Sequence, residues 1–183
     1  MQHLIGLGRT RIGMVTGRSD LLSAQQREQG YCEALVAAGL PVDEDLVRSG
    51  GFEPEIAREA ARDLLSRPSP PTAVFAADDL SALVTVEVAA ELGLDVPRQL
   101  SVVGFDDIPE SAVADPPLTT VQQPIRRMGK EAADMLLALI AGEGVADLHR
   151  TQATSLVHRA PGAGPRGLSR TVAAVVGRTP TTP

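Results

Sequence analysis

Three charged side chains stand where a sheet of parallel strands would gather them. Asp78 and Asp106 each follow directly after an apolar run, at 72–77 and 100–105, that predicts a buried strand. Arg27 lies in the first turn of the helix predicted after the first strand. Carboxylate oxygens accept hydrogen bonds from hydroxyls, and a guanidinium donates two parallel ones. Together the three residues suit a polyol with adjacent hydroxyl groups.

The elements that would position these residues alternate between strand and helix. Apolar runs predict strands at 11–16, 46–49, 72–77 and 100–105. Helical spacing of apolar residues predicts helices at 23–38, 55–66 and 80–92. This alternation is typical of an α/β fold, with a parallel doubly wound sheet and helices on both faces. If the strand order is 2-1-3-4, Arg27 and Asp78 face each other at the switch point, and Asp106 lies one strand further on.

Simpler roles compete with binding at these positions. An Asp after a buried strand is often only the N-cap of the next helix, and Asp79 fits that role. Ser23 is a plausible N-cap for the helix at 23–38. Phe52, just after the second strand, can supply an apolar wall for sugar C–H groups, or it can simply cover the sheet edge. Spacing alone leaves both interpretations open.

The segment after the fourth strand departs from the alternation. Prolines at 109, 116 and 117 argue against a helix there and predict an extended crossing into a strand at 118–121. A strongly amphipathic helix is predicted at 124–141, and a last strand at 154–158. The apolar side of the helix at 124–141 carries Ile125, Met128, Ala132, Met135, Leu136, Leu139 and Ile140. The Ala-, Gly- and Pro-rich composition of 160–183 predicts a disordered tail.

Composition narrows the class of protein. A chain of 183 residues with 43% hydrophobic and 22% charged residues is ordinary for a globular domain. Its net charge of −6 argues against a nucleic-acid surface, because phosphate binding needs a basic face. No apolar run reaches membrane-spanning length, and no signal-peptide segment is recognisable. Cys32, the single cysteine, cannot form an internal disulfide. We expect a cytoplasmic protein that needs no cofactor and no metal.

Six short motifs follow one another in a characteristic order. They are HLIGLGRTRIG (3–13), REQGY (27–31), GFEP (51–54), PTAVFAADD (71–79), SVVGFDD (101–107) and PLTTV (117–121). In these motifs the chain resembles the lactose/galactose repressor (LacI/GalR) family of transcriptional regulators. The resemblance runs from His3 to about Arg159 and covers the family's effector-binding domain, whose fold is like that of type I periplasmic binding proteins.

The resemblance implies roles for particular residues. Carried over position by position, it implies that Arg27, Asp78 and Asp106 contact the effector, with Phe52 and Ser23 as weaker candidates. One departure concerns chemistry, because Asp78 stands where many relatives have Asn. The carboxylate removes two hydrogen-bond donors and adds a negative charge.

The resemblance also implies a division into two lobes. It assigns 1–117 to the C-terminal lobe, 118–142 to a crossover strand and helix of the N-terminal lobe, and 143–159 to a return to the C-terminal lobe. The family's DNA-binding headpiece and first lobe are not found, so a truncated sugar-sensing domain is expected. It would bind a small-molecule effector, form a homodimer, and reach operator DNA only through a domain absent from this chain.

Three rival classes remain open. A transport-type sugar-binding protein shares the two-lobed fold but would need a signal peptide. A metal-dependent hydrolase could use the aspartates at 78, 79, 106 and 107 as oxygen ligands, but no nucleophile or base is recognisable. A phosphoacceptor receiver domain would need a lysine at a later strand end, and the only lysine, Lys130, lies in the helix at 124–141.

Overall fold

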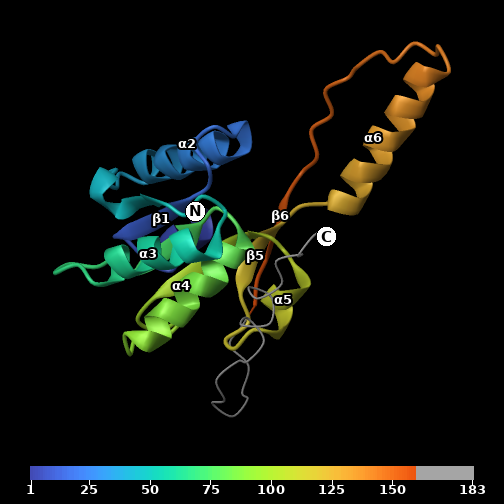
Figure 1. Cartoon of the computed structure of the whole chain (residues 1–183). Helices are drawn as coiled ribbons and strands as arrows, with labels where there is room; N and C mark the ends of the chain where they lie inside the picture. The colour runs from blue at the N-terminus through green and yellow to red at the C-terminus, as the bar shows by residue number, and fades with distance from the viewer. Residues whose placement is uncertain (160–183) are drawn as a thin grey trace.

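A six-stranded sheet forms the centre of the protein, as the computed structural model, which describes residues 1–159, shows (Figure 1). The strands are β1 (Ile12–Thr16), β2 (Val47–Ser49), β3 (Ala73–Ala76), β4 (Ser101–Asp106), β5 (Thr119–Gln122) and β6 (Ser155–Val157). Their order is β2-β1-β3-β4-β5-β6, and every neighbouring pair is parallel except β5–β6. The predicted order of the first four strands is confirmed, and with it the parallel doubly wound α/β fold.

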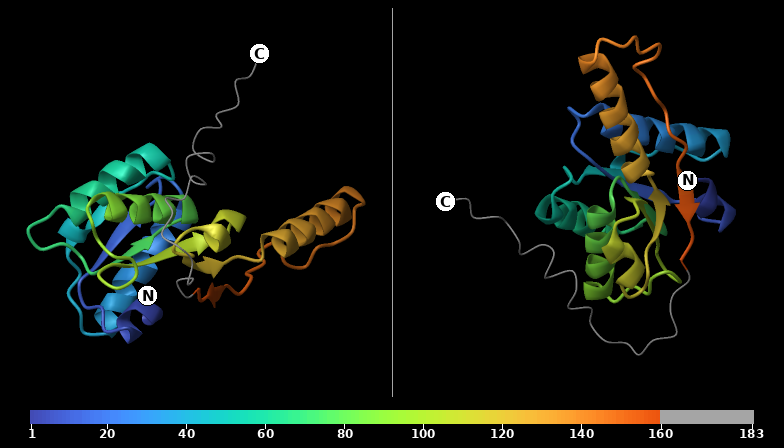
Figure 2. Two further views of the ribbon diagram at one scale, coloured as in Figure 1. Left: turned by 90° about the horizontal axis from the view of Figure 1, so that it is seen from below. Right: turned by 90° about the vertical axis from the view of Figure 1, so that its right-hand side faces the viewer.

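Helices cover both faces of this sheet, as the views in Figures 1 and 2 show. They are α1 (Gln2–Gly6), α2 (Leu22–Ala37), η1 (Glu44–Leu46, a 3₁₀ turn), α3 (Pro54–Leu65), α4 (Asp79–Glu91), α5 (Pro109–Val113) and α6 (Ile125–Ile140). Successive strand residues point to opposite faces. Val74 therefore packs in the core under α3 and α4, whereas Phe75 packs in the core under α1 and α2. Burial on both faces explains why the strands are continuously apolar rather than alternating.

The ends of α2 differ in how well the sequence predicted them. Gly39 ends α2 with a φ of +69°, a left-handed cap that favours glycine, as expected. The N-cap, however, is Leu21, and Ser23 makes no capping hydrogen bond, so the prediction for Ser23 as N-cap was wrong. Because α2 already begins at Leu22, Arg27 lies in its second turn rather than its first.

The expectation that prolines exclude a helix between β4 and β5 was also wrong. Pro109 is the first residue of the short helix α5. At this position the missing N–H would have no partner within the helix, and the fixed φ of proline is already helical. Pro116 and Pro117 follow the end of α5 and leave it intact.

The strand after α5 corrects the assignment of 118–142 to the other lobe. β5 pairs with β4 from Val103↔Thr119 to Asp106↔Gln122, so this strand belongs to the same sheet as β1 to β4. Among residues 1–159, α6 and the segment after it leave the body: α6 projects away from the sheet, and residues 143–154 run back to β6 (Figure 1). The assignment of α6 to another lobe stays a prediction. The tail predicted at 160–183 lies outside the described residues.

The buried carboxylate of Asp79 joins four parts of the fold. Its Oδ2 accepts hydrogen bonds from the backbone N–H of Ile108 at 2.9 Å and from the hydroxyl of Ser111 at 2.7 Å. Its Oδ1 accepts from the hydroxyl of Thr120. A methyl group added at Gly104 would lie 2.2 Å from Oδ1. The start of α4, the loop after β4, α5 and β5 therefore converge on one fully buried group.

No helix within residues 1–159 has the length and the apolar character that crossing a membrane requires.

Replacing Asp79 should destabilise the chain strongly. The Asp79→Ala variant leaves three buried donors without their acceptor, so we expect the free energy of unfolding to fall by about 3 kcal/mol. Urea unfolding followed by circular dichroism measures this loss. Glu59→Ala, on the exposed side of α3, is the matched control and should change stability little. Equal stabilities of the two variants would contradict a structural role for Asp79.

Candidate ligand-binding site

The structure places Arg27, Asp78 and Asp106 at one edge of the sheet. Nη2 of Arg27 lies 3.8 Å from Oδ1 of Asp106. Nη1 of Arg27 donates a hydrogen bond to the carbonyl of Ala77 at 2.6 Å, and Ala77 directly precedes Asp78. Arg27 comes from α2, Asp78 from the turn between β3 and α4, and Asp106 from the end of β4. Elements far apart in the sequence thus bring the three charges together.

Two aromatic rings lie against the guanidinium of Arg27. Its central carbon is 3.9 Å from the centroid of the Phe105 ring and 5.9 Å from that of Phe52. Both distances lie within the range of cation–π contacts. Sequence reasoning found Phe52 but missed Phe105, which it counted only as part of an apolar strand. Strand alternation is the signal that could have found it, since Phe105 shares the face of Val103, which packs in the core under α2.

Burial shifts the pKa values of the three charged groups at this site. It raises the pKa of Asp78 and that of Asp106 above the ordinary value of 3.8, and it lowers the pKa of Arg27. Asp78 is only 7% exposed, and its buried Oδ1 has no hydrogen-bond partner in the described part of the chain. A buried acceptor without a donor is costly and uncommon in folded proteins. It offers a place for a donor from a ligand, such as a hydroxyl group.

Residues with strained backbone conformations lie at the same end of the strands as the charged residues. Within residues 1–159, the non-glycine residues with positive φ are Phe52 (61°), Asp106 (122°) and Asp107 (60°). Such conformations are uncommon outside glycine, and they persist only where the surrounding structure holds them. Strain of this kind concentrates at binding and catalytic sites. Its position here agrees with the position of the charged residues.

Two glutamines hold the carboxylates that follow β4. Nε2 of Gln123 donates to Oδ1 of Asp106 at 2.6 Å, and Nε2 of Gln122 donates to Oδ2 of Asp107 at 2.6 Å. Gln122 is the last residue of β5 and Gln123 follows it, where the chain leaves towards α6. Sequence reasoning did not single them out, because only the β4–β5 pairing brings them beside the aspartates.

Ser23 is the site residue that the structure does not bring to this group. It is exposed in the first turn of α2, and no hydrogen bond or ion pair found among residues 1–159 joins it to Arg27, Asp78 or Asp106. Its contact with an effector stays a prediction. The described residues also contain no cluster of three His, Cys, Asp or Glu side chains arranged to hold a metal ion.

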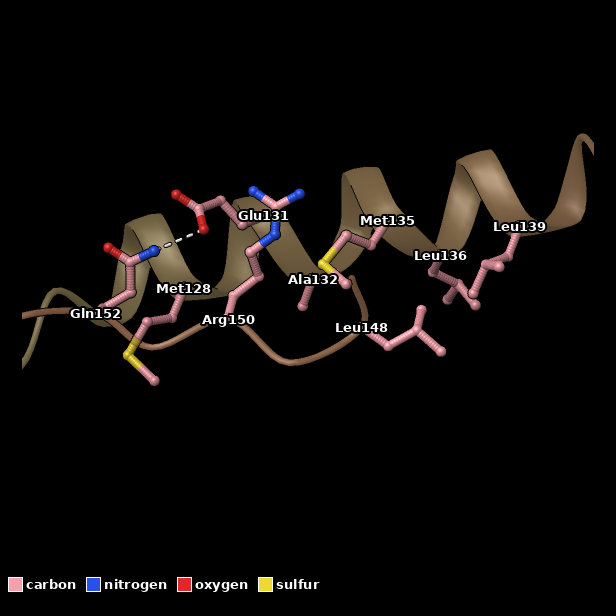
Figure 3. A pocket seen from close by; sticks show the side chains of 9 residues that line it. All are labelled: Met128, Glu131, Ala132, Met135, Leu136, Leu139, Leu148, Arg150 and Gln152. Atoms are coloured by element: carbon pink, nitrogen blue, oxygen red, sulfur yellow. Dashed lines mark hydrogen bonds between the residues drawn. The ribbon is translucent and has the colours of Figure 1, made fainter. Parts of the chain in front are cut away.

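A separate apolar groove lies between α6 and the returning segment (Figure 3). Its only hydrogen bond between lining residues joins Nε2 of Gln152 to Oε2 of Glu131 at 2.6 Å. The groove is lined by Met128, Glu131, Ala132, Met135, Leu136, Leu139, Leu148, Arg150 and Gln152. None of the residues of α6 is buried. This groove shares no lining residue with the strand-end site.

Comparison with known proteins identifies the kind of domain. Residues 1–160 match the model of the periplasmic binding protein-like domain family. The chain belongs to this family. It is 40% identical to the HTH-type transcriptional regulator CelR of Thermobifida fusca over 161 residues, 88% of this chain and 47% of that protein. It is 38% identical to the HTH-type transcriptional repressor CytR of Escherichia coli (strain K12) over 159 residues, 87% of this chain and 47% of that protein.

Solved structures give the same result. A CelR–cellobiose complex superposes with a TM-score of 0.84 at 40% identity, covering 88% of this chain and 49% of that one. The Lac repressor dimer bound to operator and the anti-inducer ONPF superposes with a TM-score of 0.80 at 31% identity, covering 86% and 54%. The resemblance to LacI/GalR regulators is confirmed. The chain spans about half the length of the curated relatives it matches.

The raised pKa of Asp78 leads to a pH-dependent prediction. Below about pH 3.8 this group is protonated in both the folded and the unfolded chain, so burial costs nothing. As the pH rises through the higher folded pKa, the buried carboxylate must ionise, and stability is lost. Asp78→Asn should therefore stabilise the chain at pH 7 and make little difference below pH 3.8.

Urea unfolding at several pH values measures this difference. Glu59→Gln, which removes one exposed carboxylate from α3, is the control and should not show the same trend. A stabilisation by Asp78→Asn that is equal at both ends of the pH range would contradict the burial argument.

Proposed function

We propose that this chain is the sugar-sensing, effector-binding part of a LacI-type transcriptional regulator. The observation that carries the proposal is the buried Oδ1 of Asp78, which has no hydrogen-bond partner in residues 1–159 and lies at the same edge as the Arg27–Asp106 pair. Hydroxyl donors of a sugar would satisfy it. The relative of 40% identity that was solved as a complex with cellobiose supports this class of ligand.

Each residue of the site receives a distinct role in this proposal. Asp78 and Asp106 accept hydrogen bonds from sugar hydroxyls, and Arg27 donates one from the nitrogen that faces Asp106. Phe52 supplies the apolar wall, since the face of Phe105 is already occupied by the guanidinium. Ser23 is a further polar contact at the margin.

The charges of the site favour an uncharged sugar. Two carboxylates share one guanidinium, so the local charge stays negative at neutral pH when all three groups are ionised. A phosphorylated or acidic sugar would meet net repulsion in a partly buried place, where charges interact more strongly than in water. A neutral polyol meets acceptors for its hydroxyls without this cost.

The remaining parts of the proposal concern the whole protein. The chain performs no catalysis, acts in the cytoplasm, and reaches operator DNA only through another domain of the regulator. α6 belongs to a second lobe, and the effector lies between the lobes. The rival transport-type and hydrolase functions lack a supporting observation among the described residues.

Sugar titrations test the binding site. Amide spectra of the ¹⁵N-labelled chain recorded with cellobiose, glucose and glucose 6-phosphate should shift at Arg27, Asp78 and Asp106 with the neutral sugars only. Arg27→Ala should weaken the affinity by about 10- to 100-fold, because it removes a hydrogen bond from a charged donor. Arg48→Ala, which breaks an ion pair with Asp63 outside the site, is the control and should bind normally. Shifts elsewhere, or equal affinities for the two variants, would refute the site.

The apolar side of α6 predicts a homodimer. Each large apolar side chain left in water forgoes about 1.5–3 kcal/mol of burial free energy, and a helix of this length is marginal without packing. For the 183-residue chain studied alone, we propose that a second copy covers the side that the second lobe would otherwise cover, as the dimeric Lac repressor among the solved neighbours suggests. Sedimentation velocity should show a dimer for the chain and a monomer for Leu136→Asp/Leu139→Asp.

A charge swap on the opposite side of α6 controls this experiment. Lys130→Asp/Asp134→Lys keeps the ion pair of these exposed residues, so the dimer should persist. A chain that sediments as a monomer, with helix content equal to that of the leucine variant, would show that a second copy does not cover α6.

A further inference from the structure

The loop that carries Asp106 needs contacts that hold it in place. Two successive non-glycine residues, Asp106 and Asp107, have positive φ, and such conformations persist only where the surrounding structure holds them. On one side, the N–H of Ile108 is held by the buried carboxylate of Asp79 at 2.9 Å. On the other side, the loop meets the end of β5 and the segment that follows β6.

Arg159, which follows β6, contacts both this loop and the start of β5. Its Nη2 lies 2.6 Å from Oδ1 of Asp107, and its Nη1 donates to the carbonyl of Leu118 at 2.9 Å. Its backbone N–H donates to the hydroxyl of Thr119 at 3.1 Å. The planar guanidinium thus bridges the loop after β4 and the start of β5, a geometry that lysine cannot reproduce.

This ion pair and the Arg27–Asp106 pair are more buried than the other ion pairs found among residues 1–159. The side chains of Arg159 and Asp107 are 17% and 11% exposed, whereas those of Arg58 and Glu91, between α3 and α4, are 38% and 45% exposed. Exposed pairs contribute little, but removing one partner of a buried pair leaves an uncompensated charge. With Gln122 on its other oxygen, the carboxylate of Asp107 is held on both sides.

We propose that Arg159 is a positioning residue for the candidate site, which it serves by holding the Asp106–Asp107 loop in its strained conformation. It does not face the ligand itself. The inference rests on the proposed function for the role of Asp106 in binding, but the placement of Asp106 can be measured without any ligand.

Two variants separate positioning from simple electrostatics. Arg159→Gln removes a positive charge and by charge alone would raise the pKa of Asp106; Asp107→Asn removes a negative charge and by charge alone would lower it. If the pair positions the loop, both variants release it and weaken the hydrogen bond from Gln123 to Asp106. Both should then move the pKa of Asp106 in the same direction, because the burial and the hydrogen bond of its carboxyl change alike in the two variants. The other charges that act on Asp106, those of Arg27, Asp78 and Asp79, are the same in both variants.

Carbon-detected NMR of the side-chain carboxyl groups of the 183-residue chain gives this pKa, and the strong intraresidue HN–Hα contact reports positive φ at Asp106. Arg58→Gln, which breaks the exposed pairs of α3 and α4, is the control and should leave both signals unchanged. A pKa of Asp106 that moves in opposite directions in the two variants, or in neither, would overturn the proposal.

Two further measurements complete the test. If Arg159→Gln does not fold, Arg159→Lys replaces it. Lysine keeps the charge, so a changed pKa of Asp106 then reports lost positioning, and an unchanged one overturns the proposal. If the chain binds cellobiose, both pair-breaking variants should weaken binding by about tenfold, and unchanged binding would also overturn the proposal. Failure of every sugar to bind would refute the proposed function and leave the pKa comparison intact.

Discussion

The fold depends on the fully buried carboxylate of Asp79. Its two oxygens accept hydrogen bonds from three donors of different elements. Its neighbour Asp78 instead has one carboxylate oxygen without a hydrogen-bond partner among residues 1–159. The two aspartates at the end of β4 differ in the same way. Asp107 is held by Gln122 and Arg159, whereas Asp106 lies beside Arg27. In each pair of adjacent aspartates, one carboxylate secures the backbone that places the other.

The strands and their order could be predicted because their signals are local. Apolar runs mark strands that are buried on both faces, and Gly39 marks the end of α2 whatever surrounds it. The errors arose where one residue type serves two purposes. Pro109 breaks a helix from within but starts one at its first position. β5 joins the sheet through backbone pairing with β4. No side chain in the sequence of β5 indicates this pairing.

The sequence predicted the charged residues of the candidate site, but it did not predict the residues that contact and support them. Arg27, Asp78 and Asp106 follow from the rule that strand ends meet at one edge of the sheet. Gln123 and Arg159 reach this loop from positions 17 and 52 residues away from their partners, and only the folded topology reveals those contacts. The charged residues at the strand ends can thus be found from local sequence patterns, whereas their contacts with Gln123 and Arg159 depend on the folded topology.

The antiparallel pairing of β5 with β6 makes the excursion through α6 a removable insertion. Gln122 and Ser155 are partners in the ladder, so the chain leaves and re-enters the body at neighbouring points. A two-residue type I′ turn such as Asn-Gly spans that gap in natural hairpins. Protein engineers could therefore replace residues 123–154 with such a turn and obtain a compact sheet domain, or use the same junction to graft a different binding module onto this scaffold.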